Sequence, residues 1–144
     1  MNAPDPFNLQ RFVKAQFEVF EQARAELEAG DKQSHWMWFI FPQIHGLGTS
    51  SMATKFAISS LKEAEAYLLH PVLGPRLREC TRIVNAVRGR SIEQILHSPD
   101  SMKFRSSMTL FAHATSDNKV FLDALNKYCD GAFDPRTLQQ IGMR

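Results

Sequence analysis

Signals that start and end helices recur at short intervals along this sequence, and no other feature constrains its fold as strongly. Ser60–Glu63 (SLKE) and Ser91–Gln94 (SIEQ) match the capping box, in which a hydroxyl and a side chain three residues later satisfy the first free amides of a helix. Asp134 precedes Pro135, an N-cap residue followed by a proline suited to the first turn. Each signal predicts a short helix that begins there.

Apolar residues between these signals recur at steps of three and four, the period of a helix with one buried face. One such pattern, Leu9–Leu27, stops before Gly30 and is either one long helix or two that meet at a bend near Gln16. Asp100 and Asp117 are placed to cap two further helices. The predicted helices cover about 9–27, 36–41, 60–70, 73–87, 91–97, 100–112, 117–128 and 134–141.

The chain has 144 residues, of which 44% are hydrophobic and 22% charged, close to the averages of globular proteins. That length is typical of one domain with one core. No segment keeps the period-two alternation of a half-buried strand. We therefore predict an all-α fold, a single compact domain over residues 1–144 with a core from about 7 to 141 and roughly seven to eight short helices.

Features that the sequence lacks disfavour several classes of protein. No stretch is long and apolar enough to cross a membrane, and the N-terminus has no secretory leader pattern. We therefore expect a soluble, cytoplasmic protein without a membrane partner. Cys80 and Cys129 lack metal-ligand spacing, and the histidines are scattered, so we expect free thiols, no metal site and no cofactor.

The net charge is only +2, but it is unevenly divided along the chain. Residues 1–72 hold 6 basic and 8 acidic side chains, whereas residues 73–144 hold 11 and 7. Much of this basic excess is arginine between residues 76 and 90. These arginines fall around a helix instead of along one stripe, and no aromatic residues alternate with them for base stacking. Nucleic-acid binding through the C-terminal arginines is therefore the weakest of three functional hypotheses.

The least ordinary segment is HWMWFIFPQIHGLG, residues 35–48, which contains both tryptophans of the chain. Its six consecutive apolar residues fit a strand or a buried helix, but a single strand would lack a partner. We predict a short, buried helix, capped by Ser34 and ended by Pro42. At helical spacing, one face of this helix carries Trp36, Phe39 and Ile40.

Polar groups at the ends of this apolar run must either find partners or face a cavity. His35 is the candidate catalytic residue, an acid or base tuned by its aromatic surroundings, and Gln43 offers a planar pair of donor and acceptor. Trp36 and Trp38 would be either core anchors or a stacking surface. Because Gly46–Gly48 lets the backbone come close to another molecule, the segment favours a planar or polar ligand.

A second polar cluster lies on the helix predicted over 100–112. Lys103 and Ser107 are one helical turn apart, and so are Arg105 and Thr109. The segment, which also contains Ser106, therefore presents two adjacent polar faces near the helix start that could hold a carboxylate or a phosphate. The alternative is an ordinary solvated face whose serines bond back to the preceding turn. Catalysis by a serine nucleophile is not indicated, because no acidic residue is placed to orient a histidine base and no GxSxG motif occurs.

The first functional hypothesis is therefore binding or processing of a small polar ligand, phosphorylated or nucleotide-like, at a pocket near His35, Gln43 and Arg105. The second is a non-catalytic protein-interaction module in which the aromatic segment is only core and the polar residues hold turns. The sequence leaves open whether the protein is an enzyme and which oligomer it forms.

Four blocks of sequence together carry a resemblance to a known family. They are residues 35–48, FAIS at 56–59, HPVLGPRLREC at 70–80 and RSSMTLF at 105–111. In this combination the chain, from about Phe7 to Ile141, resembles the bacterial domain-of-unknown-function family 1810 (DUF1810). The resemblance implies an all-helical fold and brings no established activity, substrate or catalytic residue. Some relatives carry the label calpastatin, which does not fit, because calpastatin-type inhibition uses disordered, repeated segments and this sequence has a compact core pattern.

Overall fold

The structure is a computed structural model that describes residues 4–143, and within this range it is all-helical, as predicted. It has ten helices in the described range, so the prediction of roughly seven to eight was wrong. The helices are α1 (Gln10–Gln16), α2 (Phe20–Glu28), α3 (Met37–Ile40), α4 (Ser51–Lys55), α5 (Leu61–Leu69), α6 (Leu73–Ala86), α7 (Ile92–Leu96), α8 (Asp100–Ala112), α9 (Lys119–Tyr128) and α10 (Pro135–Gln140).

Two local features account for the additional helices. The apolar pattern that was open to one helix or two is divided between α1 and α2, and Phe17 at the break is 80% exposed. Helix α4 lies in a segment for which no helix was predicted, and it has no buried residue that would give it an apolar stripe. Its start is nevertheless capped, because the Ser50 hydroxyl accepts a hydrogen bond from the amide of Ala53 at 3.1 Å.

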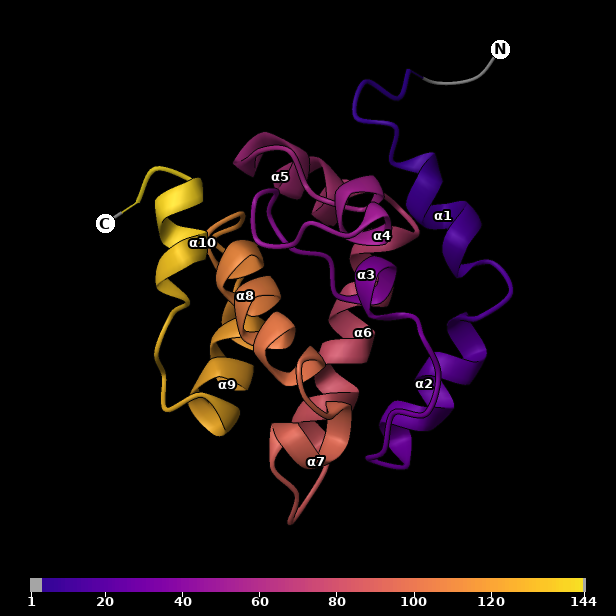
Figure 1. The fold of residues 1–144 in the computed structure, drawn as a ribbon, viewed down its shortest axis with the longest axis vertical. Coiled ribbons are helices and arrows are strands. Elements are labelled where there is room, and N and C mark those ends of the chain that lie inside the picture. The colour runs from indigo at the N-terminus through magenta and orange to yellow at the C-terminus, as the bar shows by residue number, and fades with distance from the viewer. Residues whose placement is uncertain (1–3, 144) are drawn as a thin grey trace.

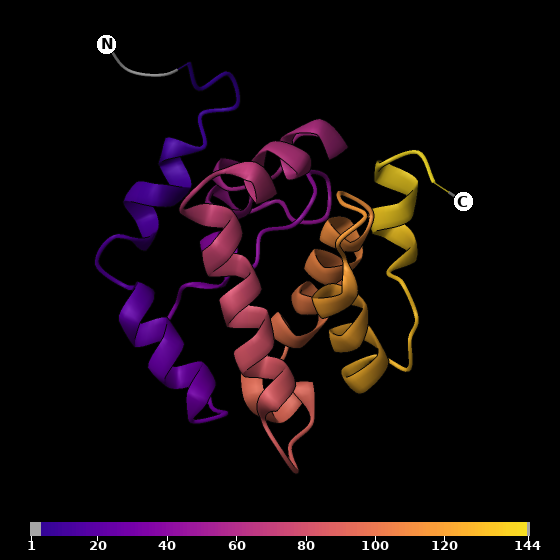
Figure 2. The same ribbon diagram turned by 180° about the vertical axis from the view of Figure 1, so that it is seen from behind.

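Helix α6, the longest, runs along the back of the molecule, with α1 and α2 on one side of it and α8 to α10 on the other (Figure 2). It packs against α2, α5 and α9, while α8 packs against α5, α7, α9 and α10. Seen from the opposite side, the short helix α3 lies in front of α6, and α8 lies beside them (Figure 1). The segment around α3 therefore lies between the N-terminal helices and the C-terminal group.

The core of the molecule is rich in aromatic rings contributed by several helices. Tyr67 of α5 lies against Phe12 of α1 and Phe111 of α8, with ring centroids 5.1 and 5.3 Å apart. Phe41, just after α3, meets Phe104 of α8 edge to face at 5.1 Å. These contacts join the start, middle and end of the chain in one continuous core.

The predicted start signals are confirmed where a side chain had no stronger partner. Ser91 and Gln94 form the full capping box at α7, and Asp134 accepts a hydrogen bond from the amide of Thr137 at the start of α10. At α5 only half of the box forms: Ser60 caps the helix, but the Glu63 carboxylate turns to Ser59 instead.

Three other predicted caps were wrong, because each side chain has a different partner or lies one or two positions away. Asp100 is the first residue of α8, after the N-cap Pro99, and its carboxylate pairs with Lys32 at 2.9 Å. The N-cap of α9 is Asn118, one residue after Asp117. The N-cap of α3 is Trp36, while the Ser34 hydroxyl donates to the Glu26 carboxylate at 2.6 Å.

Neither cysteine is in a disulfide: Cys80 is buried and Cys129 half-buried, both as free thiols, as their spacing predicted. Burial raises the pKa of the Cys80 thiol to about 12 and that of Cys129 to about 11. Both thiols are therefore protonated, and weak nucleophiles, at neutral pH. Among the residues described, no helix has the length and apolar character needed to span a bilayer.

Candidate functional site

The aromatic segment 35–48 divides into a buried part and a part that faces a cavity. Trp36, Phe39 and Ile40 are buried, which confirms the predicted core face. Trp36 is only 1% exposed, and its indole N–H donates to the Glu26 carboxylate at 2.9 Å. Trp36 therefore anchors α3 to α2 and has no surface left for a ligand.

Glu26 holds the chain that leads into this segment. One carboxylate oxygen accepts hydrogen bonds from the amides of Gln33 and Ser34 and from the Trp36 indole, and the other accepts from the Ser34 hydroxyl and Gln22. Burial alone would raise the pKa of this carboxyl, but the hydrogen bonds outweigh it and lower the pKa to about 2. Glu26 is thus ionised in the folded protein and organises the turn before α3.

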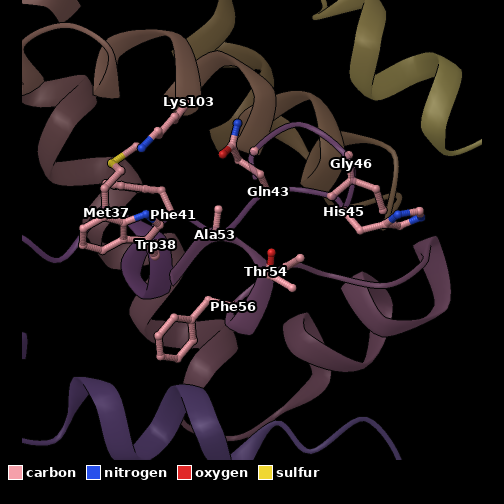
Figure 3. Close-up of a pocket in the computed structure, with 13 residues that line it drawn as sticks. Met37, Trp38, Phe41, Gln43, His45, Gly46, Ala53, Thr54, Phe56 and Lys103 are labelled. Carbon is pink, nitrogen blue, oxygen red and sulfur yellow. The ribbon is translucent and has the colours of Figure 1, made fainter. Parts of the chain in front are cut away.

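A cavity of about 270 Å³, here called the inner cavity, opens beside α3. Its wall combines aromatic and aliphatic side chains with a few polar groups (Figure 3). The residues that line it are Met37, Trp38, Phe41, Gln43, Ile44, His45, Gly46, Gly48, Ala53, Thr54, Phe56, Ala57 and Lys103. Trp38 is half-buried, so part of its ring remains accessible on this wall, unlike that of Trp36.

The position of Gln43 follows from a short backbone pairing. Its carbonyl accepts a hydrogen bond from the amide of Ile58 at 2.8 Å, and Ile44 and Ile58 form an isolated parallel bridge. Ile44 is buried at the edge of the core, whereas Gln43 is half-buried, and both contribute to the cavity wall. Within residues 4–143 the side-chain amide of Gln43 makes no hydrogen bond, so its donors and acceptor are available to a ligand.

Lys103 reaches the same cavity from α8, on the side of Met37 and Trp38 in the view of Figure 3. Its ammonium lies 5.4 Å from the centre of the Trp38 ring and 3.5 Å from the Asp100 carboxylate. Asp100 is shared, because its other oxygen pairs with Lys32 at 2.9 Å. One carboxylate between two lysines leaves a net positive charge. Lys103 is the more accessible lysine, because its side chain is 27% exposed and that of Lys32 is 8% exposed.

The inner cavity is therefore electropositive, and its wall is polar and apolar in similar parts. Lys103 carries its one permanent charge, and no carboxylate is among the lining residues of the described chain. The wall opposite α8 is held by α10, since the Gln140 amide donates to the carbonyl of His45 at 2.9 Å. Gly46 is needed there, because it has a φ of +90° and a Cβ would lie 2.3 Å from the Gln140 amide nitrogen.

A larger hollow of about 760 Å³, the outer cavity, lies next to the inner one. Gln43, Gly48, Ala53 and Lys103 line both. The remaining wall of the outer cavity is mixed: its polar residues are Thr49, Ser50, Glu93, Ser101, Arg105, Ser106, Asp130, Asp134 and Arg136, and its apolar residues are Leu47, Ile92, Pro99, Met102, Tyr128, Cys129 and Ala132. The two hollows are therefore adjacent, and the outer one carries more charged groups.

Arg105 and Ser106 hold the wall of the outer cavity together. The Arg105 guanidinium donates to the carbonyls of Ala132 and Phe133 at 2.9 and 2.6 Å. Ser106 donates to the Asp134 carboxylate at 3.0 Å, and the same carboxylate caps α10. Both residues thus hold the backbone of the outer wall in place, and the Arg105 guanidinium keeps further N–H donors beyond these two hydrogen bonds.

The predicted site residues thus fall into three groups. Trp38, Gln43 and Lys103 line the inner cavity; Gln43, Lys103, Arg105 and Ser106 line the outer one; His35, Trp36 and Ser107 line neither. His35 is exposed. Ser107 is fully buried in α8, and its hydroxyl has no hydrogen-bond partner in the described chain.

The sequence reasoning did not nominate several residues of the two walls. Thr54 lies on α4, the helix that was not predicted. Glu93 and Asp130 come from two separate helix ends, and Arg136 comes from α10. Nothing in their spacing along the chain signals that they meet, because the tertiary fold alone brings these segments together.

The comparison with curated proteins gave no match. Among solved structures, the chain is similar to the conserved hypothetical protein Rv1873 from Mycobacterium tuberculosis, with 54% sequence identity and a TM-score of 0.95. The alignment covers 97% of this chain and 100% of that one. Residues 6–141 match the family described as protein of unknown function (DUF1810). With nearly its whole length matched, the chain belongs to the DUF1810 family.

Proposed function

We propose that the protein binds a small anionic molecule whose flat, apolar part occupies the inner cavity. The observation that carries this proposal is the incompletely balanced charge of Lys103 on an aromatic wall to which no described residue contributes a carboxylate. An anion entering there gains a charge-assisted hydrogen bond in surroundings of reduced polarity. Binding is the function that the charge and the shape of this wall support.

Each wall group has a distinct role in this proposal. Lys103 holds the anionic group, Trp38 offers the accessible ring surface against which a flat ligand lies, and Gln43 pairs with a polar edge of the ligand. A volume of about 270 Å³ suits an aromatic ring with a short substituent and lies just below the ~300–1,000 Å³ of common ligand pockets. The ligand class is therefore an aromatic carboxylate or a nucleotide.

The test is isothermal titration calorimetry with AMP, UMP, benzoate and indole-3-acetate on the intact protein and on the Lys103→Gln variant. We expect the variant to bind the accepted anions at least about tenfold more weakly, equivalent to ~1.4 kcal/mol. Lys62→Gln, an exposed lysine of α5, is the matched control and should bind like the parent protein. Adenosine, which lacks the charge of AMP, should bind more weakly than AMP to the parent protein.

Two results would refute the proposed function. One is the absence of measurable binding by all four anions at millimolar concentration. The other is binding that Lys103→Gln leaves unchanged, because the anion would then be held elsewhere.

The C-terminal arginines give less support to nucleic-acid binding than the cavity gives to a small anion. Arg76 stacks on Phe20 and donates to Gln16, and Arg78 donates to the carbonyl of Asp117. Arg90 donates to two backbone carbonyls. These side chains already hold helices and loops together, so fewer cations are free to contact phosphates.

A further inference from the structure

The inner cavity adjoins the outer one at Lys103, and this adjacency says more about the ligand. Four residues belong to both walls, namely Gln43, Gly48, Ala53 and Lys103. A ligand whose anionic group is held by Lys103 therefore has room on both sides of that group. The outer cavity, at about 760 Å³, is the larger of the two.

The free groups of the outer wall differ from those of the inner wall. Glu93 and Asp130 are exposed and make no side-chain hydrogen bond or ion pair within residues 4–143, unlike Asp134, which is taken up by the cap of α10. Both carboxylates also raise the pKa of Cys129, for which burial is the larger cause, so they lie near the same part of the wall. Hydroxyl groups of Thr49 and Ser101 line the cavity with them.

The two free carboxylates accept hydrogen bonds from neighbouring hydroxyls of a ligand, and with Asp134 they balance the positive charges of Lys103, Arg105 and Arg136 on the same wall. The outer cavity therefore suits a neutral group better than a second anion. The groups thus run from the aromatic rings of the inner cavity, through the cation of Lys103, to a charge-balanced outer wall with two free acceptors. A molecule complementary to this order has a flat ring, an anionic linkage and a neutral part rich in hydroxyls.

We propose that the ligand is a nucleoside diphosphate sugar, with its base in the inner cavity, its diphosphate at Lys103 and its terminal sugar against Glu93 and Asp130. This inference rests on the proposed function and adds that the ligand extends from the inner cavity into the outer one. Gln43, which lines both cavities, lies where the base-bearing part meets the diphosphate. No bond is made or broken in this binding event.

The experiment compares ligands with and without the terminal group by calorimetry on the full chain: UDP against UDP-glucose, ADP against ADP-ribose, and CDP against CDP-choline. In at least one of the first two pairs, the sugar should improve affinity about tenfold. The double variant Glu93→Gln/Asp130→Asn should lose that gain and bind UDP or ADP as well as the parent or better, because a repulsion is removed. Glu65→Gln/Asp123→Asn, two exposed carboxylates outside both cavities, is the matched control and should keep the gain.

The outcomes separate this inference from the proposed function. Equal affinities within each pair, with binding that still depends on Lys103, would overturn the extended ligand and leave the anion site intact. A gain for CDP-choline alone would overturn the sugar and assign the two carboxylates to a cationic group. If no nucleotide binds at all, the inference is overturned, whereas binding of an aromatic carboxylate that depends on Lys103 would still support the proposed function.

Discussion

Replacing Glu26 by glutamine tests whether one buried carboxylate holds the segment that leads into α3. The substitution keeps the size of the side chain but removes its charge. Glu26 is 9% exposed and accepts five hydrogen bonds, three of them from the amides of Gln33 and Ser34 and the Trp36 indole. An amide in its place would turn an N–H group towards Gln22 and the Ser34 hydroxyl, so the network would lose its charged acceptor.

The magnitude follows from the pKa of this carboxyl. The pKa falls from an ordinary value of 4.5 in the unfolded chain to about 2 in the folded protein, because the hydrogen bonds outweigh the effect of burial. At ~1.36 kcal/mol for each pKa unit, ionised Glu26 contributes about 3 kcal/mol to the free energy of unfolding. Since the folded pKa is the lower one, this stability is present above about pH 4.5 and is lost as the pH falls towards 2.

The assay is urea unfolding followed by tryptophan fluorescence at pH 7 and at pH 3.5. At pH 7, Glu26→Gln should be less stable than the parent protein by about 3 kcal/mol. Between the two pH values, the parent should lose about 1.5 kcal/mol more than the variant, because only the parent can protonate this group. Glu28→Gln, on the same helix with a side chain 56% exposed, is the control and should change stability by less than ~0.5 kcal/mol. A Glu26→Gln protein within ~1 kcal/mol of the parent at pH 7, or parallel losses on acidification, would refute the reasoning.

Three further substitutions separate packing from binding. Trp36→Ala should lower the free energy of unfolding by about 3–5 kcal/mol in urea melts, because Trp36 is buried. Trp38→Ala, at a half-buried position, should lower the free energy of unfolding clearly less and should weaken anion binding in calorimetry. Equal losses of stability in the two variants would contradict this division. Gly74→Ala should cost about 1–3 kcal/mol, because the new Cβ would lie 2.1 Å from the Leu68 carbonyl oxygen where α5 meets α6, and an unchanged thermal midpoint would count against that contact. Arg105→Gln should release the 132–133 backbone, which limited proteolysis would detect as faster cleavage near Ala132 than in an Arg136→Gln control.

The fold was predictable from sequence where the signal was local. Ser91 with Gln94, and Asp134 with Pro135, start helices in the structure as their sequence motifs predicted, because each cap is satisfied within four residues. The prediction failed where a distant partner competed for the same side chain. The Asp100 carboxylate pairs with Lys32, and a contact between residues so far apart in the chain cannot be predicted from the sequence around Asp100.

The candidate site was predictable in part for the same reason. Trp38 and Gln43 belong to the unusual aromatic segment, and Lys103 belongs to the polar cluster of the helix predicted over 100–112; all three line the inner cavity. His35 had an equally suggestive place in the sequence but lies exposed, away from both cavities. Which way a polar residue at the end of a helix faces depends on the path of the chain, and no local pattern encodes that path.

The hydrogen bond from Gln140 to the carbonyl of His45 joins residues 95 positions apart and has a consequence for synthesis of the protein. During translation, the segment 43–48 leaves the ribosome long before the helix that holds one side of it. The binding wall therefore cannot be completed while the chain is growing, even if α1 to α3 have already collapsed around their aromatic rings. A nascent chain halted before α10 would have a folded core without a finished pocket. Binding of the ligand would therefore indicate that α10 has packed against the rest of the domain.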